Sequence, residues 1–198
     1  MNHKLRRLEE IECSEDNAQE ALQVILHTII FARWPNAVKV PSEVQTACGV
    51  SYASCGDPSV ARRVQTASAA AVTGTLEEAG PDLLKGALTL TFFERRTSKV
   101  AFWAYNEKLV WEEWVLPFLV ATHKTPSPRQ SVAEKERYAE SLRCRVMEVL
   151  AQLNEGVDHV PPADGLPTEA SHDFEVSCGH RGEQGEPFGA RVMAAPAV

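Results

Sequence analysis

The sequence predicts one α+β domain, with a central antiparallel sheet packed against about three helices. Residues 87–94 alternate between two faces, and the apolar run at 111–121 follows them, so the two segments form an antiparallel hairpin. Three other segments carry apolar residues at helical spacing: 15–34, 58–80 and 131–156. The 198 residues are enough for one substantial core, and we expect a single domain over residues 1–198.

The first helix is predicted to start after Ser14, which supplies a side-chain oxygen cap ahead of two acids. Asn17 and Glu20 also have the spacing of a capping box. A wide apolar stripe follows and includes Ala18, Leu22, Ile25 and Ile29. The helix should end at Trp34, because the residue before a proline is pushed out of helical geometry. A stripe of this width is typical of a helix buried between a sheet and another element.

The other two helices have their own start and stop signals. Asp57 is a predicted N-cap and Pro58 suits the first helical position, with Gly80-Pro81 marking the end. Residues 131–134 resemble a capping box for the third helix, and Gly156 is a natural C-terminal cap. The buried stripe of this third helix is predicted to comprise Tyr138, Leu142, Val146, Val149, Leu150 and Leu153.

The segments outside these helices contain sequence patterns typical of β-strands. Leu5, Leu8 and Ile11 indicate a short first strand, and residues 50–55 indicate another. In the returning strand at 111–121 we expect one face to hold Trp114, Leu116, Phe118 and Val120, and the other to hold Trp111, Val115 and Leu119. Pro117 removes a backbone donor from this strand, so it requires an edge position or a bulge.

Composition narrows the classes of partner. The formal net charge is −7, and the longest basic clusters are pairs of arginines, which argues against duplex nucleic acid and against direct membrane insertion. No segment has the pattern of a signal peptide or the length of a membrane span. The five cysteines are scattered, without a C-x-x-C pair, so neither a disulfide framework nor a zinc site is expected. A reduced, cytoplasmic protein is the consistent interpretation.

Three of the four tryptophans fall within a dozen residues of one another. Trp111 and Trp114 lie at the start of the returning strand, where we expect them to pack in the core. Phe102 and Trp103 lie in the connection between the two hairpin strands, which we expect to form a long tip after Glu94. Large aromatic rings exposed on a loop mark a binding site. Phe102 and Trp103 are therefore the candidate partner-binding residues, unless the loop folds back and buries them.

A catalytic site is not predicted. Cys55, His27 and Asp57 are the residues that a Cys-His thiol hydrolase would have to recruit, and Cys55 lies just before a helix N-terminus, which favours a thiolate. His27, however, lies beside an apolar stripe and is expected to be structural. Glu112 and Glu113 point to opposite faces of a strand, so they cannot act as an acid/base pair.

Metal and cofactor sites are not predicted either. His172-Asp173 and the Cys178-Gly-His180 segment contain ligand residue types but lack a second matched pair. The glycine-rich stretch at 179–189 lacks the pattern of a phosphate-binding loop. We expect no catalytic residue, no metal and no cofactor.

Several segments together resemble the autophagy-related protein 101 family. The most specific are residues 20–33, which contain Leu-His-Thr, and residues 111–114, Trp-Glu-Glu-Trp, with residues 88–94 between them. Residues 50–56 and 154–162 are similar to plant-type members. The matches keep their order from residue 8 to about 178, and residues 179–198 match least.

This resemblance implies a HORMA fold, with a C-terminal segment that can fold over the sheet. It also implies a non-enzymatic adaptor of the autophagy-initiation kinase complex, located in the cytoplasm and at the phagophore assembly site. Members pair with the HORMA domain of autophagy-related protein 13, and HORMA pairs commonly use the third helix. They recruit downstream autophagy factors through an exposed Trp-Phe finger. Phe102 and Trp103 fall where that finger lies, in the order Phe then Trp.

Two alternatives remain open at this point. A HORMA adaptor of another complex, from the spindle checkpoint or translesion synthesis, shares the fold but should lack the aromatic loop. A thiol hydrolase requires Cys55 to be exposed and reactive.

Overall fold

A long β-hairpin forms the centre of the fold. In the computed structural model, which describes residues 3–34, 40–74, 76–100, 103–122, 132–161 and 170–179, strands β6 (Leu83–Val100) and β7 (Trp103–Ala121) pair antiparallel along their whole length. At 97–100, 103–106, 133 and 170 the backbone alone is described. Four more strands complete a six-stranded sheet: β1 (Lys4–Arg7), β2 (Ile11–Ser14), β5 (Glu77–Gly80) and β8 (Ala170–Cys178). Strands β5 to β8 form its antiparallel part, while β1 and β2 run parallel to β7.

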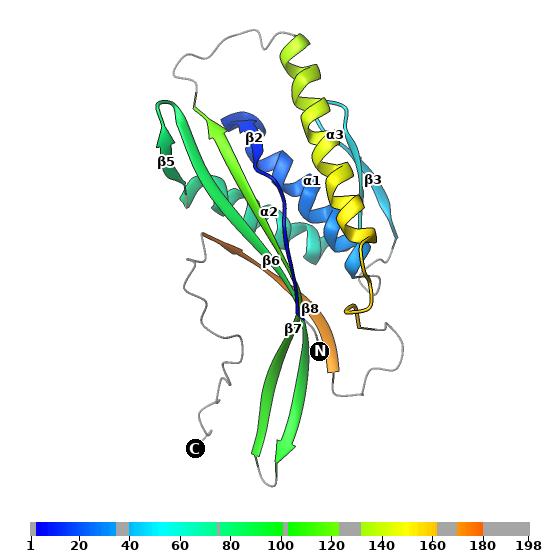
Figure 1. Cartoon of the computed structure of the whole chain (residues 1–198). Coiled ribbons are helices and arrows are strands. Elements are labelled where there is room, and N and C mark those ends of the chain that lie inside the picture. The colour runs from blue at the N-terminus through cyan, green and yellow to red at the C-terminus, as the bar shows by residue number, and fades with distance from the viewer. Residues whose placement is uncertain are drawn as a thin grey trace.

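Three helices among the described residues pack on this sheet: α1 (Glu15–Arg33), α2 (Pro58–Gly74) and α3 (Val132–Asn154). Helix α1 lies between the other two and contacts both. A separate two-stranded sheet, β3 (Ser42–Gln45) with β4 (Ser51–Ser54), also contacts α1 through β4. Figure 1 shows the helices gathered around the upper half of the sheet, while the end of the hairpin projects away from them. The predicted α+β class is confirmed.

Helix α1 has the predicted limits, with Ser14 as N-cap and Trp34 as C-cap. The Ser14 side chain makes no capping hydrogen bond, and Asn17 lies inside the first turn, so the predicted side-chain cap and the capping box at Asn17 are wrong. The apolar stripe explains the stability of the helix instead. The completely buried residues of this stripe are Ala18, Ala21, Leu22, Val24, Ile25, Leu26, Ile29 and Ile30. Burial of such a stripe outweighs a missing cap.

Helix α2 begins as predicted and ends earlier. The carboxylate of Asp57 accepts a hydrogen bond from the backbone N–H of Ser59 at 2.8 Å. The predicted end at Gly80-Pro81 is wrong, because the helix stops at Gly74 and the following segment pairs with β6 as β5. Pro81 and Asp82 make the turn between β5 and β6, and Asp82 has a φ of 57°, as the third position of a type II turn requires.

A bulge changes the predicted faces of β7. Glu112 pairs with Phe92 and Val110 pairs with Phe93, so Trp111 is an extra residue in β7. The bulge turns Trp111 into the same core as Trp114, and its ring stacks on Phe92 with centroids 5.2 Å apart. The prediction that the two tryptophans lie on opposite faces is therefore wrong, whereas the prediction that both are core residues is confirmed by exposures of 2% and 0%.

Pro117 lies where β7 lacks a partner on its outer side. The predicted single first strand is in fact two: β1 pairs with β7 at 112–115 and β2 pairs with it at 118–121. On its inner side Pro117 faces Ala87, whose carbonyl accepts a hydrogen bond from Gly179 on the β8 side. The N–H that proline lacks would have pointed into the gap between β1 and β2, so no ladder bond is lost.

Candidate interaction surfaces

The end of the central hairpin is a two-stranded ribbon that we call the finger, residues 97–106. Pairing of β6 with β8 ends at Arg96, and pairing of β7 with β1 ends at Glu112. Beyond these points β6 and β7 pair only with each other among the described residues, as far as Val100 and Trp103 (Figure 1, lower part). The predicted long tip after Glu94 is therefore wrong, because cross-strand hydrogen bonds extend the strands almost to the turn.

One of the two predicted binding residues lies at the end of this finger. Phe102 lies outside the described residues. Trp103 is the first residue of β7, and its backbone pairs with Val100. Within the described residues the finger ends at Val100 and Trp103, and the assignment of partner binding to Phe102 and Trp103 stays a prediction.

Charged side chains brace the base of the finger around Phe93. The ammonium of Lys108 lies 4.2 Å from the centroid of the Phe93 ring, and the guanidinium of Arg95 lies 5.4 Å from it. Each cation also pairs with an acid on β8: Lys108 with Glu175, and Arg95 with Asp173. Single surface ion pairs contribute little, but these contacts connect β6, β7 and β8 at one point. The base of the finger is held in place there.

Beneath the finger, Glu112 is completely buried between two arginines. Its Oε1 accepts a hydrogen bond from Nε of Arg6 at 2.7 Å, and its Oε2 accepts one from Nε of Arg33 at 2.6 Å. The side chains of Arg6 and Arg33 are only 3% and 5% exposed. Nε2 of His159 lies 3.3 Å from Oε2 of Glu112. A buried carboxylate is stable only with such charge-assisted partners.

These arginines also hold the end of α3, which completes what we call the Glu112 cluster (Arg6, Arg33, Glu112 and His159). Arg6 donates to the carbonyl of Glu155 at 2.6 Å, and Arg33 donates to that of Leu153 at 2.9 Å. The cluster was not predicted from sequence. A charged residue inside an apolar strand, beside tryptophans, is the signal that could have indicated it. Glu113 points to the other face, as predicted.

Helix α3 has an exposed apolar patch on its outer side. Leu142, Val149 and Leu153 are buried as predicted, but Leu150 is 39% exposed, so its assignment to the buried stripe is wrong. Met147 is 64% exposed on the same side. Arg143 and Glu140, both exposed, precede Met147 on this face and form an ion pair at 3.4 Å. We call these four residues, two apolar and two charged, the α3 surface.

The residues of the proposed thiol hydrolase do not form a reactive site. Cys55 is completely buried, and burial followed by the Asp57 carboxylate raises the pKa of its thiol, against a smaller opposing backbone hydrogen bond. The expectation that the helix N-terminus favours a thiolate is therefore wrong. His27 is buried against Tyr52, with ring centroids 5.5 Å apart. It is a packing residue of α1.

Burial of His27 predicts a pH dependence of stability. Burial lowers the pKa of His27 below its ordinary value of 6.5. As the pH falls below that value, His27 therefore takes up a proton in the unfolded chain before it does so in the folded chain. Stability should therefore fall as the pH falls below 6.5. We expect His27→Gln to reduce the loss of unfolding midpoint between pH 7.5 and pH 5.5, measured by urea denaturation. Equal losses in the variant and the parent would contradict this assignment.

Neither a cluster of metal ligands nor a membrane-spanning helix is found among the described residues. Within them no three His, Cys, Asp or Glu side chains come together as a set of metal ligands, and His180 lies outside them. None of the helices they contain is long and apolar enough to cross a membrane.

The three helices of the described residues, the mixed sheet and its projecting hairpin make an α+β architecture that is consistent with a HORMA-like fold. The family model of autophagy-related protein 101 matches residues 10–165, so the chain belongs to the autophagy-related protein 101 family. Autophagy-related protein 101 of Arabidopsis thaliana is 26% identical to it over 195 residues, which cover 89% of this chain and 87% of the relative. The resemblance seen in the sequence is confirmed.

Proposed function

We propose that this chain is a non-enzymatic adaptor of the autophagy-initiation kinase complex, in the cytoplasm and at the phagophore assembly site. It pairs with the HORMA domain of autophagy-related protein 13 and recruits downstream autophagy factors through the finger. Membership of an autophagy-related family supports the general role. The burial of Cys55 argues against a thiol hydrolase, and the family match argues against an adaptor of the spindle checkpoint or translesion synthesis.

The finger is the observation that carries this proposal. A two-stranded ribbon has no hydrophobic face of its own to bury and is only marginally stable unless its base is anchored. Here ion pairs and cation–π contacts hold the base, and the sequence places the aromatic pair Phe102-Trp103 after the end of β6, at the start of β7. Large aromatic side chains are the most effective anchors in protein interfaces. A projecting, braced ribbon that ends at Trp103, with Phe102 next to it in the sequence, is suited to insertion into a pocket of a partner.

Replacing both aromatic residues should abolish recruitment without affecting the fold. We expect Phe102→Ala with Trp103→Ala to weaken capture of downstream autophagy factors from a lysate by at least about tenfold, since hot-spot aromatics contribute about 2 kcal/mol or more each. Under this proposal the two rings lie outside the core, so the thermal unfolding midpoint should change by less than about 3 °C.

A matched control lies in the same ribbon. Thr97 and Asn106 face each other across the finger, so Thr97→Ala with Asn106→Ala changes two residues without removing a ring. This variant should recruit normally. A midpoint that falls by many degrees in the aromatic double variant would show that the rings are core residues, and unchanged recruitment would refute the role of the finger.

The α3 surface is the proposed site of HORMA pairing. Arg143→Glu with Met147→Ala should weaken binding to the HORMA domain of autophagy-related protein 13 by about tenfold or more, because it reverses one charge and removes the most exposed apolar side chain of the patch. Isothermal titration calorimetry with the purified domain measures the change. Arg62→Glu, an exposed charge reversal on α2, is the control and should bind normally. Equal affinities for all three proteins would exclude this surface.

A further inference from the structure

The small sheet formed by β3 and β4 has an open edge. Strand β4 packs against α1, with Tyr52 stacked on His27. All four residues of β3 are exposed, and within the described part of the chain β3 pairs with β4 alone. Of the devices that protect an edge strand from added partners, the strand lacks proline, lysine and a bulge, and has only its length of four residues and the charge of Glu43.

Hydrogen-bond alternation identifies the backbone groups that this edge offers. The N–H of Thr46 donates to the carbonyl of Val50 at 2.9 Å, and the N–H of Val50 donates to Oγ1 of Thr46 at 2.9 Å. These two residues therefore form a hydrogen-bonded pair at the end of the hairpin, with one of the two bonds made by the Thr46 side chain. In an antiparallel ladder such pairs alternate with non-bonded ones. The pairs of Glu43 with Ala53 and of Gln45 with Ser51 are then non-bonded. Glu43 and Gln45 therefore direct their N–H and C=O groups outward, away from β4.

The start of β3 is held in a defined position by a close backbone approach. Gly56, with a φ of +67°, lies against Val40, and a Cβ at this glycine would come within 1.9 Å of the Val40 carbonyl oxygen. Only glycine fits there. Because the segment before α2 packs directly on the residue before Pro41, the open edge is preorganised for binding.

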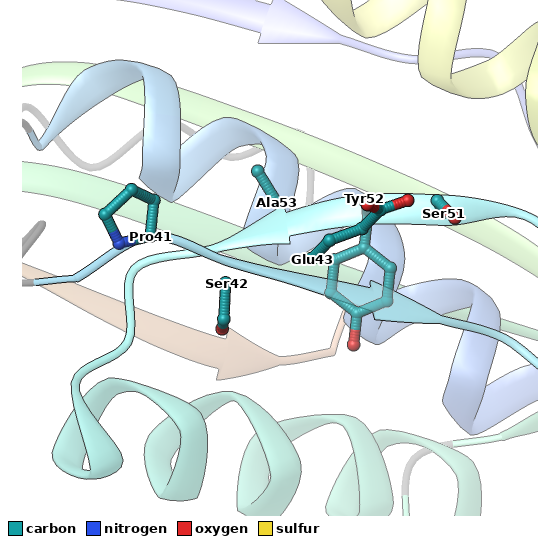
Figure 2. Close-up of a pocket in the computed structure, with 6 residues that line it drawn as sticks. All are labelled: Pro41, Ser42, Glu43, Ser51, Tyr52 and Ala53. Carbon is teal, nitrogen blue, oxygen red and sulfur yellow. The ribbon is translucent and has the colours of Figure 1, made fainter.

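A shallow pocket lies over the same two strands. Its volume is about 340 Å³, and it is lined by Pro41, Ser42, Glu43, Ser51, Tyr52 and Ala53. Figure 2 shows Tyr52 and Ser42 pointing to one side of the strands and Ala53 to the other. Glu43 is the only charged residue in this lining, and a second carboxylate, Glu20, accepts the N–H of Ala47 at the hairpin turn. The local charge is negative, as is that of the whole chain at −7.

We propose that the outer edge of β3 binds an extended segment of a partner protein, which adds a strand and places a lysine or arginine beside Glu43. In strand addition, main-chain hydrogen bonds supply affinity and a pocket for a side chain supplies specificity. Here the outward N–H and C=O groups of Glu43 and Gln45 provide the main-chain hydrogen bonds. The pocket with the Glu43 carboxylate provides the specificity for one side chain. This surface is separate from the finger and from the α3 surface, and it does not depend on the function proposed above.

Selection from a displayed library of random nine-residue peptides on the full-length chain tests the proposal. We expect the selected peptides to carry a lysine or arginine at a fixed position and to slow hydrogen exchange of the Glu43 and Gln45 amides. Gln45→Pro removes an outward N–H and should weaken binding at least about tenfold, while Gln45→Ala, which keeps it, should bind normally. Glu43→Lys should weaken binding more than Glu43→Gln does.

Two results would overturn the proposal. One is a set of selected peptides that do not slow hydrogen exchange of the Glu43 and Gln45 amides. Selected peptides that bind Gln45→Pro and Glu43→Lys as tightly as the parent chain count in the same way. The other is self-association of the chain through this edge, seen as a dimer that Gln45→Pro dissociates, because the occupant would then be a second copy. If Gln45→Pro fails to fold by circular dichroism, the comparison of Glu43→Lys with Glu43→Gln and the exchange data decide the question.

Discussion

Glu112→Ala is expected to lower the free energy of unfolding by about 3–5 kcal/mol, because it leaves two buried arginines without their carboxylate. Both arginines would still be confined by the carbonyls of α3, so they cannot simply turn to solvent. For a domain of this size the loss corresponds to a fall in Tm of about 6–20 °C. Urea denaturation followed by tryptophan fluorescence measures the free energy directly.

The control for this prediction is a glutamate of the same sheet with an exposed partner. Glu175 pairs with Lys108 at the surface, so Glu175→Ala should cost less than about 1 kcal/mol. Replacing the whole ionic group with apolar residues, Arg6→Met, Arg33→Met and Glu112→Leu together, should restore much of the stability that Glu112→Ala loses. A loss below about 1 kcal/mol in Glu112→Ala would show that the cluster does not stabilise the fold.

Trp114→Ala is expected to have a comparable effect, a loss of about 3–5 kcal/mol, because it leaves a large cavity in the core. Trp114 is completely buried, faces Leu90 on β6 and lies under the guanidinium of Arg6, 5.2 Å from the ring centroid. Trp114→Phe fills most of the cavity and should cost clearly less. Chemical denaturation of the purified variants gives both values.

Trp103→Ala is the informative comparison for Trp114. If Trp114 is a core residue and Trp103 is a binding residue, Trp103→Ala should change the free energy of unfolding by less than about 1 kcal/mol. Similar losses of the free energy of unfolding in Trp103→Ala and Trp114→Ala would contradict these two assignments. The comparison therefore tests the tryptophan assignment without any partner protein.

The Glu112 cluster connects the two proposed binding surfaces. Glu112 follows the bulged Trp111 at the root of the finger, and its arginine partners hold the backbone at the end of α3. The four residues of the α3 surface lie about one to four turns before that end. Glu112 and its two arginines therefore link the bulge of β7 to the backbone at the end of α3.

Much of the fold could be predicted from local patterns. The limits of α1, the start of α2, the position of α3 and the pairing of 87–94 with 111–121 all follow from periodicity and from residues such as Pro35, Asp57 and Pro58. Strands β3 and β5 could not be predicted in this way. Their residues, Ser-Glu-Val-Gln and Glu-Glu-Ala-Gly, have little strand preference and adopt this geometry because a neighbouring strand pairs with them.

The candidate site likewise has some features that the sequence predicts and others that only the folded structure reveals. By itself the sequence determined the helices, the central hairpin and the aromatic pair at its turn, because periodicity, turn chemistry and residue type act over a few neighbouring positions. Only the tertiary structure decided that the hairpin continues as a paired ribbon, that Trp111 turns into the core and that Glu112 is buried among cations. Arg6 and Arg33 lie 106 and 79 residues from Glu112 along the chain, and such contacts exist only when the folded backbone brings the charges together.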